Sequence, residues 1–501
     1  MKLTHCLLLF ALASPPAVAQ SVEHAYVFDS GFVPAPSAGA TITIGFVVDV
    51  PGATSLRLRF SDVELAGGAQ LRIVSLADGA KQTHTQFTAR QWNNTSAYFN
   101  GDAVWVEVLA QPSTDPSRVR LESVSAGVAV PPSPSQCGTS DDRALSSDPR
   151  VGRLQPSICT AFLVEHCSHP LMTAGHCVGG FNIVEFNVPI SSSGGNLIHP
   201  PPSDQYAIDP LSLRSSATAI GSDWAIFGCF ANPDTGKTPY EAQLVAFTRQ
   251  APPAFDPSLT MRVTGYGYDL SPPERNFSQQ THAGPYFSLS GNVVRYQADT
   301  MGGNSGSPVI LESTGAVIAI HTNGGCDALL TGSNAGTSLS SGSVLGALST
   351  PQGVLSCTGT WSTYCTAQVN SQGCTPAISA LGTPKASLGA GSFTIRATNV
   401  LNQQNGILFY GINGENISFQ GGTLCVRSPL TRTGITNSGG STGGTDCSGV
   451  ISYDMGARIA SGVDPRLHAG ATLFAQFWQR DGFAAPFTTN LTDAIRFTIG
   501  N

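Results

Sequence analysis

The chain has 501 residues, of which 11% are charged, and its formal net charge of -7 includes no basic run. This length suggests about three domains, and the sparse acidic charge argues against nucleic acid and anionic membrane surfaces as partners. Glycine (55 residues) and proline (33 residues) are plentiful, which favours short strands joined by many turns over long helices.

Residues 1–19 have the features of a secretory signal peptide. Lys2 is followed by an apolar run over 6–13 and by Ala-Val-Ala at 17–19. No later segment approaches about 18 uninterrupted apolar residues, so we expect no membrane span. We expect a secreted, extracellular protein with disulfide bonds. Eleven of the 12 cysteines lie outside the signal, so at least one thiol is free or pairs between chains.

Residues 20–130 are expected to form a small antiparallel β domain, a sandwich. Apolar and polar residues alternate over 41–48, 55–60, 70–74 and 103–108, which is the period-two pattern of half-buried strands. The segment contains no convergent set of titratable residues, so it is either a removable pro-segment or a permanent accessory module. A proline-rich linker follows at 131–136 and predicts a domain boundary and a processing site.

Three short motifs contain candidate catalytic residues. Thr-Ala-Gly-His-Cys occupies 173–177, Ser-Asp-Trp-Ala occupies 222–225, and Gly-Gly-Asn-Ser-Gly-Ser-Pro occupies 302–308. A serine with glycines on both sides lies on a backbone that can turn tightly and approach a ligand closely. The N–H groups of Gly303 and Ser305 are therefore candidate donors to an oxyanion.

We expect Ser305 to be the nucleophile, His176 the general base and Asp223 the carboxylate that orients the base. An unperturbed histidine titrates near pH 6.5 and can therefore take up and release a proton at neutral pH. The main alternatives to Asp223 are Asp204 and Asp209. Both lie among prolines in an expected loop, whereas Asp223 begins an apolar strand.

The order His176, Asp223, Ser305 resembles that of the chymotrypsin-like double β-barrel serine proteases. The resemblance is closest to the bacterial glutamyl endopeptidase (V8-like) branch and is carried by segments 173–177, 222–225, 299–308 and 319–325. It covers residues 137–357. It implies a double β-barrel and a serine endopeptidase that acts on proteins or peptides without a cofactor.

The resemblance also implies a disulfide between Cys159 and Cys177, beside the histidine. Cys167 departs from the simplest family pattern, and the sequence does not pair the other cysteines of this region, Cys137, Cys229, Cys326 and Cys357. Because such proteases commonly carry a pro-segment, we interpret residues 20–130 as one. The Glu-His-Cys-Ser-His cluster at 165–169 lacks four ligands at tetrahedral spacing, so we expect no metal there.

Two sets of residues compete to bind the substrate side chain that precedes the scissile bond. Asp299 lies six residues before Ser305, where trypsin-like enzymes carry a carboxylate that selects Arg or Lys. Thr300 and His321 instead match the residues with which glutamyl endopeptidases bind a substrate carboxylate. The two interpretations demand opposite pocket charges. We favour a preference for Glu or Asp, with His321 as the discriminating residue.

Residues 358–501 are expected to form a second β-sandwich, with strands over 393–397, 406–410, 473–478 and 495–499. The simplest pairing of its cysteines is Cys365–Cys374 and Cys425–Cys447, one of three possibilities. The segment weakly resembles C-terminal modules of secreted bacterial proteins. It is a candidate for binding a surface or carbohydrate ligand, and a stabilising cap is the alternative.

The expected fold class is therefore mainly β, with a chymotrypsin-like double β-barrel flanked by an N-terminal and a C-terminal β-sandwich. The leading functional hypothesis is a serine endopeptidase. One alternative is a catalytically silent relative whose terminal modules bind an extracellular partner. Another is a zymogen whose N-terminal domain blocks the active site.

Overall fold

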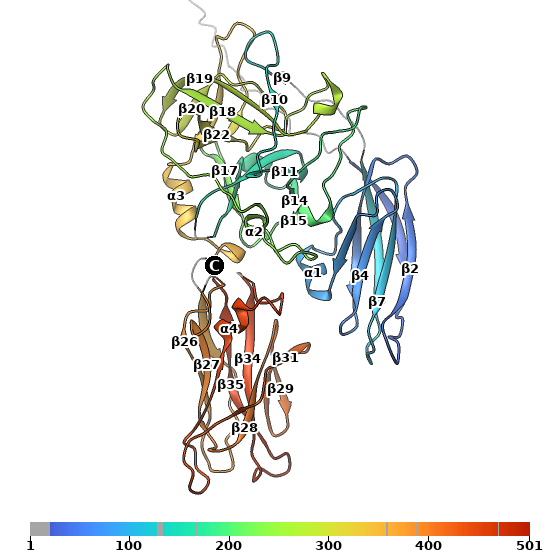
Figure 1. Ribbon diagram of the computed structural model, residues 1–501, viewed down its shortest axis with the longest axis vertical. Helices are drawn as coiled ribbons and strands as arrows, with labels where there is room; N and C mark the ends of the chain where they lie inside the picture. The colour runs from blue at the N-terminus through green and yellow to red at the C-terminus, as the bar shows by residue number, and fades with distance from the viewer. Residues whose placement is uncertain are drawn as a thin grey trace, which may run out of the picture.

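The computed structural model describes residues 21–127, 134–166, 168–356, 359–386, 388–468 and 470–500. Within these ranges β-strands predominate and build three successive units (Figure 1). The expected signal at 1–19 and part of the expected linker at 131–136 lie outside the described residues. Among the helices of the described ranges, none combines the length and the apolar character that a bilayer crossing requires.

The N-terminal unit is a sandwich of two four-stranded sheets, with the orders β1-β8-β3-β6 and β2-β7-β4-β5. Its elements are β1 Ser21–Asp29, β2 Thr41–Asp49, β3 Ser55–Glu64, β4 Gln70–Ser75, β5 Lys81–His84, α1 Gln86–Gln91, β6 Phe99–Asn100, β7 Ala103–Ala110 and β8 Arg118–Gly127. Alternate residues of β4, such as Leu71 and Ile73, are buried between the sheets. The predicted sandwich is confirmed, and we call it the N-terminal sandwich.

The first barrel is a seven-stranded sheet with the order β15-β14-β11-β12-β13-β17-β16. Its strands are β11 Val151–Pro156, β12 Cys159–Leu163, β13 Leu171–Thr173, β14 Phe181–Glu185, β15 Gln205–Ala207, β16 Arg214–Ala217 and β17 Asp223–Phe227. An antiparallel bridge between Ile208 and Cys229 joins the segments that follow β15 and β17 and closes the sheet into a barrel. Every residue of β12 and β17 is buried.

The second barrel has the order β10-β19-β18-β22-β23-β24-β20, and a further pairing of β19 with β20 closes six of these strands. Its strands are β10 Ala144–Leu145, β18 Thr260–Gly265, β19 Gln280–Ser290, β20 Val293–Tyr296, β22 Pro308–Leu311, β23 Ala316–Asn323 and β24 Asn334–Ser338. A separate two-stranded sheet pairs β9 Pro134–Ser135 with β21 Thr300–Met301. The short helices α2 Pro239–Gln243 and α3 Gly342–Ser349 lie outside the sheets. Ile310 and Val317 belong to the same buried cluster as Phe162 and Phe227 of the first barrel. The predicted double β-barrel is thus confirmed.

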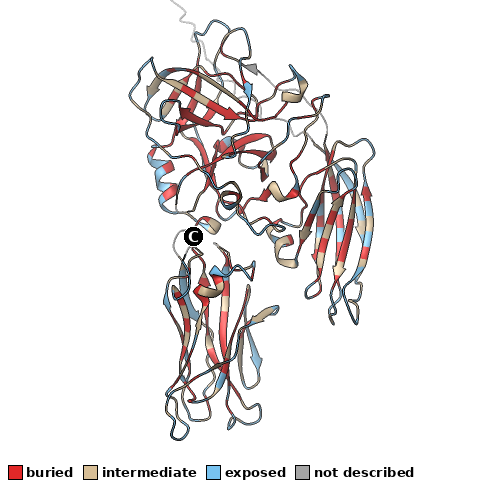
Figure 2. Ribbon diagram, viewed as in Figure 1, coloured by how far each residue is buried: buried red, intermediate tan, exposed pale blue. Residues whose placement is uncertain are grey.

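The C-terminal unit is also a sandwich. A sheet with the order β25-β35-β34-β28-β31, which β32 joins at β28, faces the sheet β26-β27-β33, and β29 pairs with β30 as a hairpin. The elements are β25 Thr360–Tyr364, β26 Ala377–Gly382, β27 Phe393–Val400, β28 Asn405–Gly411, β29 Gly414–Phe419, β30 Gly422–Val426, β31 Leu430–Arg432, β32 Thr436–Asn437, β33 Gly449–Asp454, α4 Met455–Ala460, β34 Thr472–Arg480 and β35 Thr489–Thr498. Figure 2 shows buried residues along the strands of all three units.

The predicted cysteine pairing of the C-terminal unit is wrong. The structure joins Cys365 to Cys425 and Cys374 to Cys447. Cys365 directly follows β25, an edge strand next to β35, and the hairpin strand β30 that carries Cys425 packs against β35. The hydroxyl of Tyr364 also donates to the carbonyl of Cys425. The disulfides therefore join cysteines that are close in the folded structure, whereas the prediction joined cysteines that are close in the sequence.

The N-terminal sandwich is joined to the β14–β15 side of the first barrel (Figure 1). Tyr98 N–H donates to Gln205 Oε1, and Gln205 Nε2 donates back to the Tyr98 carbonyl, both at 2.8 Å. Asn100 and His199 exchange a similar pair of hydrogen bonds. The ring of Tyr98 also stacks on that of His199, with 4.5 Å between centroids. Ile183 of β14 is buried in the core of the sandwich, so the two units share apolar surface.

Candidate active site

His176 and Asp223 meet because the strands that carry them are neighbours. His176 lies in the 3₁₀ turn Gly175–Cys177 that follows β13, and Asp223 is the first residue of β17, which pairs with β13. The ring Nδ1 of His176 is 2.6 Å from Asp223 Oδ2, and the backbone N–H of His176 donates to Oδ1 at 2.9 Å. One carboxylate therefore fixes both the ring and the backbone of the histidine. The His176 side chain keeps 41% exposure, against 10% for Asp223.

The turn that carries His176 is held from two sides. A Cβ atom on Gly175 would lie 1.9 Å from the carbonyl oxygen of Ser216, so only glycine allows the turn to pack this closely on β16. On the other side, Cys177 forms a disulfide with Cys159, the pairing that the family resemblance implies. The histidine thus stands on a rigid backbone.

Ser305 lies on a loop that packs against the start of β12, next to the histidine turn. Its carbonyl accepts a hydrogen bond from Thr160 N–H at 2.8 Å, and the hydroxyl of Thr160 donates to the Gly303 carbonyl at 3.0 Å. The Ser305 carbonyl oxygen is 4.0 Å from Cys177 Sγ. No hydrogen bond among the described residues joins the Ser305 hydroxyl to the His176 ring. In ligand-free sites such contacts are often long and tighten when substrate binds.

The loop around Ser305 presents two free backbone donors. Gly303 has φ +102°, and a Cβ atom there would lie 2.3 Å from the Tyr266 carbonyl oxygen, so the turn requires glycine. Asn304 donates its backbone N–H to the Met301 carbonyl and accepts Met301 N–H on its side-chain oxygen, each at 2.9 Å. Within the described part of the chain, the N–H groups of Gly303 and Ser305 have no acceptor. They are available to an oxyanion.

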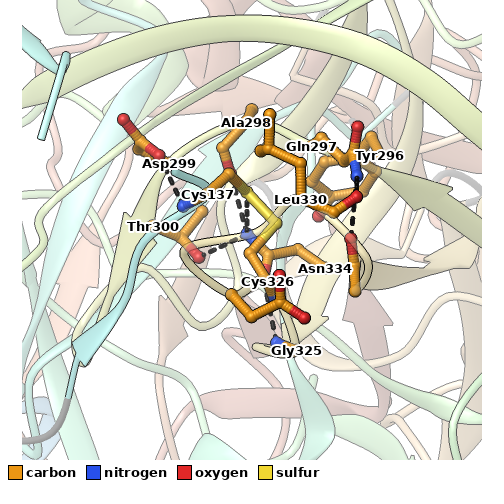
Figure 3. The surroundings of a disulfide bond; sticks show 12 residues. Cys137, Tyr296, Gln297, Ala298, Asp299, Thr300, Gly325, Cys326, Leu330 and Asn334 are labelled. Carbon is orange, nitrogen blue, oxygen red and sulfur yellow. Dashed lines mark hydrogen bonds between the residues drawn. A yellow bond between two sulfur atoms is a disulfide. The ribbon is translucent and has the colours of Figure 1, made fainter. Parts of the chain in front are cut away.

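The structure places Asp299 in an anchoring role. Its Oδ1 accepts the Cys137 N–H at 2.8 Å, and its Oδ2 accepts the Asp142 N–H at 2.9 Å. The residue is 1% exposed. Figure 3 shows it beside the disulfide between Cys137 and Cys326. Each carboxylate oxygen of Asp299 is therefore already engaged in holding the chain that enters the double barrel.

Thr300 is buried in a polar cluster that sequence reasoning missed. Its hydroxyl accepts a hydrogen bond from Asn334 Nδ2 at 3.0 Å, and the same nitrogen donates to the Ala298 carbonyl at 2.7 Å (Figure 3). The side-chain oxygen of Asn334 accepts Gly325 N–H. Asn334 thus ties together segments that are remote in sequence, and a single asparagine in a strand gives no signal of this role.

His321 is hydrogen-bonded through its backbone to the loop that carries Ser305. Its backbone N–H donates to the Ser307 carbonyl, and its own carbonyl accepts Gly306 N–H, both at 2.8 Å. Its ring Nδ1 is 2.6 Å from the hydroxyl of Tyr296, a partner that the sequence did not indicate. Burial lowers the pKa of His321 to about 3, with the positive charge of His176 acting in the same direction. The ring is therefore neutral at physiological pH.

Neither alternative carboxylate reaches the histidine. Asp204 accepts a hydrogen bond from Asn187 Nδ2 at 2.8 Å, and burial raises its pKa. Asp209 accepts the Val354 N–H at 2.9 Å, and burial raises its pKa as well. Among the described residues neither Asp204 nor Asp209 makes a contact with His176, so Asp223 is the histidine's carboxylate partner.

Two groups of metal-binding residue types lie at or near the site among the described residues. In the first, which contains His176, the two cysteines Cys159 and Cys177 are joined in a disulfide and offer no thiolate ligand. The second group consists of two aspartates and a histidine. Ligand atoms of Asp142, His282 and Asp299 lie within 4.8 Å of one another. However, both Asp299 oxygens accept backbone hydrogens, and Asp299 N–H donates to His282 Nδ1 at 2.8 Å. Because these atoms are already engaged, we assign no metal to the group.

No protein-family model matches the chain, and no curated protein matches it in sequence. Solved structures are similar to part of it. A Glu endopeptidase in complex with MPD is 17% identical, covers 42% of this chain and 97% of its own, and has a TM-score of 0.34. The thermostable serine protease AL20 from an extremophilic microorganism is 18% identical, covers 38% and 91%, and has a TM-score of 0.30.

The protease Anisep from Arthrobacter nicotinovorans is also similar, at 18% identity. It covers 39% of this chain and 93% of its own, with a TM-score of 0.30. These similarities say nothing about catalytic residues or substrates in the present chain.

Proposed function

We propose that the protein is a secreted serine endopeptidase that hydrolyses peptide bonds through Ser305, His176 and Asp223. The observation that carries the proposal is the His176–Asp223 hydrogen bond of 2.6 Å beside the Ser305 loop, in which the N–H groups of Gly303 and Ser305 have no acceptor among the described residues. A nucleophile, an oriented base and oxyanion donors are the parts that acyl transfer requires. A structural histidine–aspartate pair would not need the adjoining free amides.

In the proposed mechanism, His176 accepts the proton of Ser305 as the hydroxyl oxygen attacks the peptide carbonyl. The N–H groups of Gly303 and Ser305 stabilise the resulting oxyanion. His176 then gives its proton to the leaving amine, and an acyl group remains on Ser305 until water repeats the sequence. Asp223 keeps the ring in the tautomer with its hydrogen on Nδ1 and stabilises the imidazolium.

We also propose that the enzyme cleaves after Glu or Asp. Two observations support this preference over one for Arg or Lys. Both oxygens of Asp299 are held by backbone N–H groups, so this carboxylate is poorly placed to bind a substrate cation. The backbone of His321, in contrast, is hydrogen-bonded to Gly306 and Ser307, the two residues that follow Ser305, so this histidine lies close to the proposed nucleophile.

The test is digestion of a peptide library by the secreted protein, with Ser305→Ala as the matched control. We expect cleavage after Glu and Asp by the wild type and no cleavage by the variant, as followed by mass spectrometry. Cleavage after Arg or Lys would reject the acidic preference and leave the protease proposal standing. A wild-type protein that cleaves nothing would reject the protease proposal itself.

A further inference from the structure

Tyr296 and His321 form a buried pair next to the candidate nucleophile. Tyr296 ends β20, His321 lies in β23, and the two are 0% and 4% exposed. The Tyr296 hydroxyl is 2.6 Å from His321 Nδ1. The His321 backbone is hydrogen-bonded to Gly306 and Ser307, so the strand position that carries the ring is fixed to the loop that holds Ser305.

The direction of this hydrogen bond follows from the partners that are present. Burial raises the pKa of Tyr296 well above its ordinary value, so the hydroxyl keeps its hydrogen. Among the described residues, His321 Nδ1 is the one hydrogen-bond partner of that hydroxyl. If Nδ1 carried the ring hydrogen, the buried Tyr296 hydrogen would have no acceptor, and a buried donor without a partner is unfavourable. The hydroxyl therefore donates to Nδ1, and the neutral imidazole carries its hydrogen on Nε2.

We propose that Tyr296 is a positioning residue for substrate selection, because it leaves His321 with a hydrogen-bond donor, Nε2–H, as the ring nitrogen that has no partner among the described residues. A ring in this state can donate to a side chain but cannot accept from one. It therefore favours a substrate carboxylate and tolerates a carboxamide, whereas it disfavours ammonium and guanidinium groups. This inference rests on the proposed endopeptidase function and specifies how that site selects its substrate.

Replacing Tyr296 by phenylalanine tests the inference. The ring of His321 then loses the donor on Nδ1 and populates both tautomers. We expect kcat/KM for a Glu peptide to fall about fivefold, the effect of one hydrogen bond, mainly through KM. Labelling of Ser305 by a fluorophosphonate without a peptide side chain should keep its wild-type rate. Tyr286→Phe is the matched control, because Tyr286 is a buried neighbour of Tyr296 in the sheet and its hydroxyl donates to Pro253.

Nitrogen NMR of histidine in the full chain with Ser305→Ala provides a readout that does not need activity. We expect His321 to carry its hydrogen on Nε2, and to show mixed tautomers when Tyr296→Phe is added. His321→Gln identifies the signal. A hydrogen on Nδ1 would overturn the inference, as would an unchanged Glu preference in Tyr296→Phe. The absence of peptidase activity in the wild-type protein would instead reject the proposed function. The NMR measurement of the His321 tautomer would still test whether Tyr296 donates to Nδ1.

Discussion

Replacing Asp223 by asparagine is expected to lower kcat for peptide hydrolysis by about 10,000-fold. Asp223 accepts from both the ring and the backbone of His176. An asparagine of the same shape offers an NH₂ group in place of one oxygen, which favours the histidine tautomer with hydrogen on Nε2. That tautomer cannot accept a proton from Ser305. Steady-state kinetics on a peptide cleaved by the wild type measures the effect.

Asp204→Asn is the control for this experiment. Asp204 is also an aspartate of the first barrel region, but its carboxylate accepts a hydrogen bond from Asn187 and makes none with the histidine among the described residues. We expect it to retain activity within a few fold of the wild type. An Asp204→Asn variant as impaired as Asp223→Asn would contradict the assignment of the carboxylate.

The largest expected effect on stability comes from a buried ion pair in the first barrel. Arg153 and Glu185 are both fully buried, with 2.8 Å between Nε and Oε2. The guanidinium also donates to the carbonyls of Phe277 and Ile198, and His199 Nδ1 is 2.5 Å from the other Glu185 oxygen. His199 also stacks on Tyr98 of the N-terminal sandwich, so the ion pair is connected through His199 to the contact between the two units.

Arg153→Met should therefore lower the free energy of unfolding by about 3 kcal/mol or more, since it leaves a buried carboxylate without its main partner. The urea midpoint of the full chain, followed by tryptophan fluorescence, measures the loss. Arg262→Met is the control: its partner Glu312 is exposed, and an exposed pair contributes about 1 kcal/mol or less. Equal losses in the two variants would contradict the role given to burial.

Acid should weaken the same network. Although burial by itself raises the pKa of Glu185, the charges of Arg153 and His199 lower it to about 2 from an ordinary 4.5. A carboxylate with a depressed pKa contributes stability above its unfolded pKa and loses it as pH falls towards the folded value. We therefore expect the wild type to lose stability between about pH 4.5 and pH 2, and Arg153→Met to lose less in that range.

Much of the fold was predictable because it depends on local patterns. Alternation of apolar and polar residues correctly located strands such as β3 and β4, since in a strand with one buried face every second residue points into the core. The motifs around His176 and Ser305 could also be recognised in the sequence, because each contains a glycine at a position where the backbone packs too closely for any other residue. Gly175 and Gly303 are examples, with neighbouring carbonyl oxygens that exclude any Cβ.

The features that the sequence did not reveal depend on contacts between distant segments. Cys365 pairs with Cys425 because hairpin β29–β30 packs against β35, a packing that no local pattern indicates. Asp299 matched a substrate-binding position in the motif, yet it accepts N–H groups of residues more than 150 positions away. Tyr296 reaches His321 only because β20 and β23 both pair with β24.

We propose that Ser305 is a nucleophile activated by His176. The most direct measurement is peptide mapping by mass spectrometry after the secreted protein reacts with a fluorophosphonate. We expect a single adduct, on Ser305, that is lost or forms much more slowly in His176→Ala. An unmodified Ser305 in the wild-type protein, or labelling of Ser305 at an unchanged rate in His176→Ala, would contradict it.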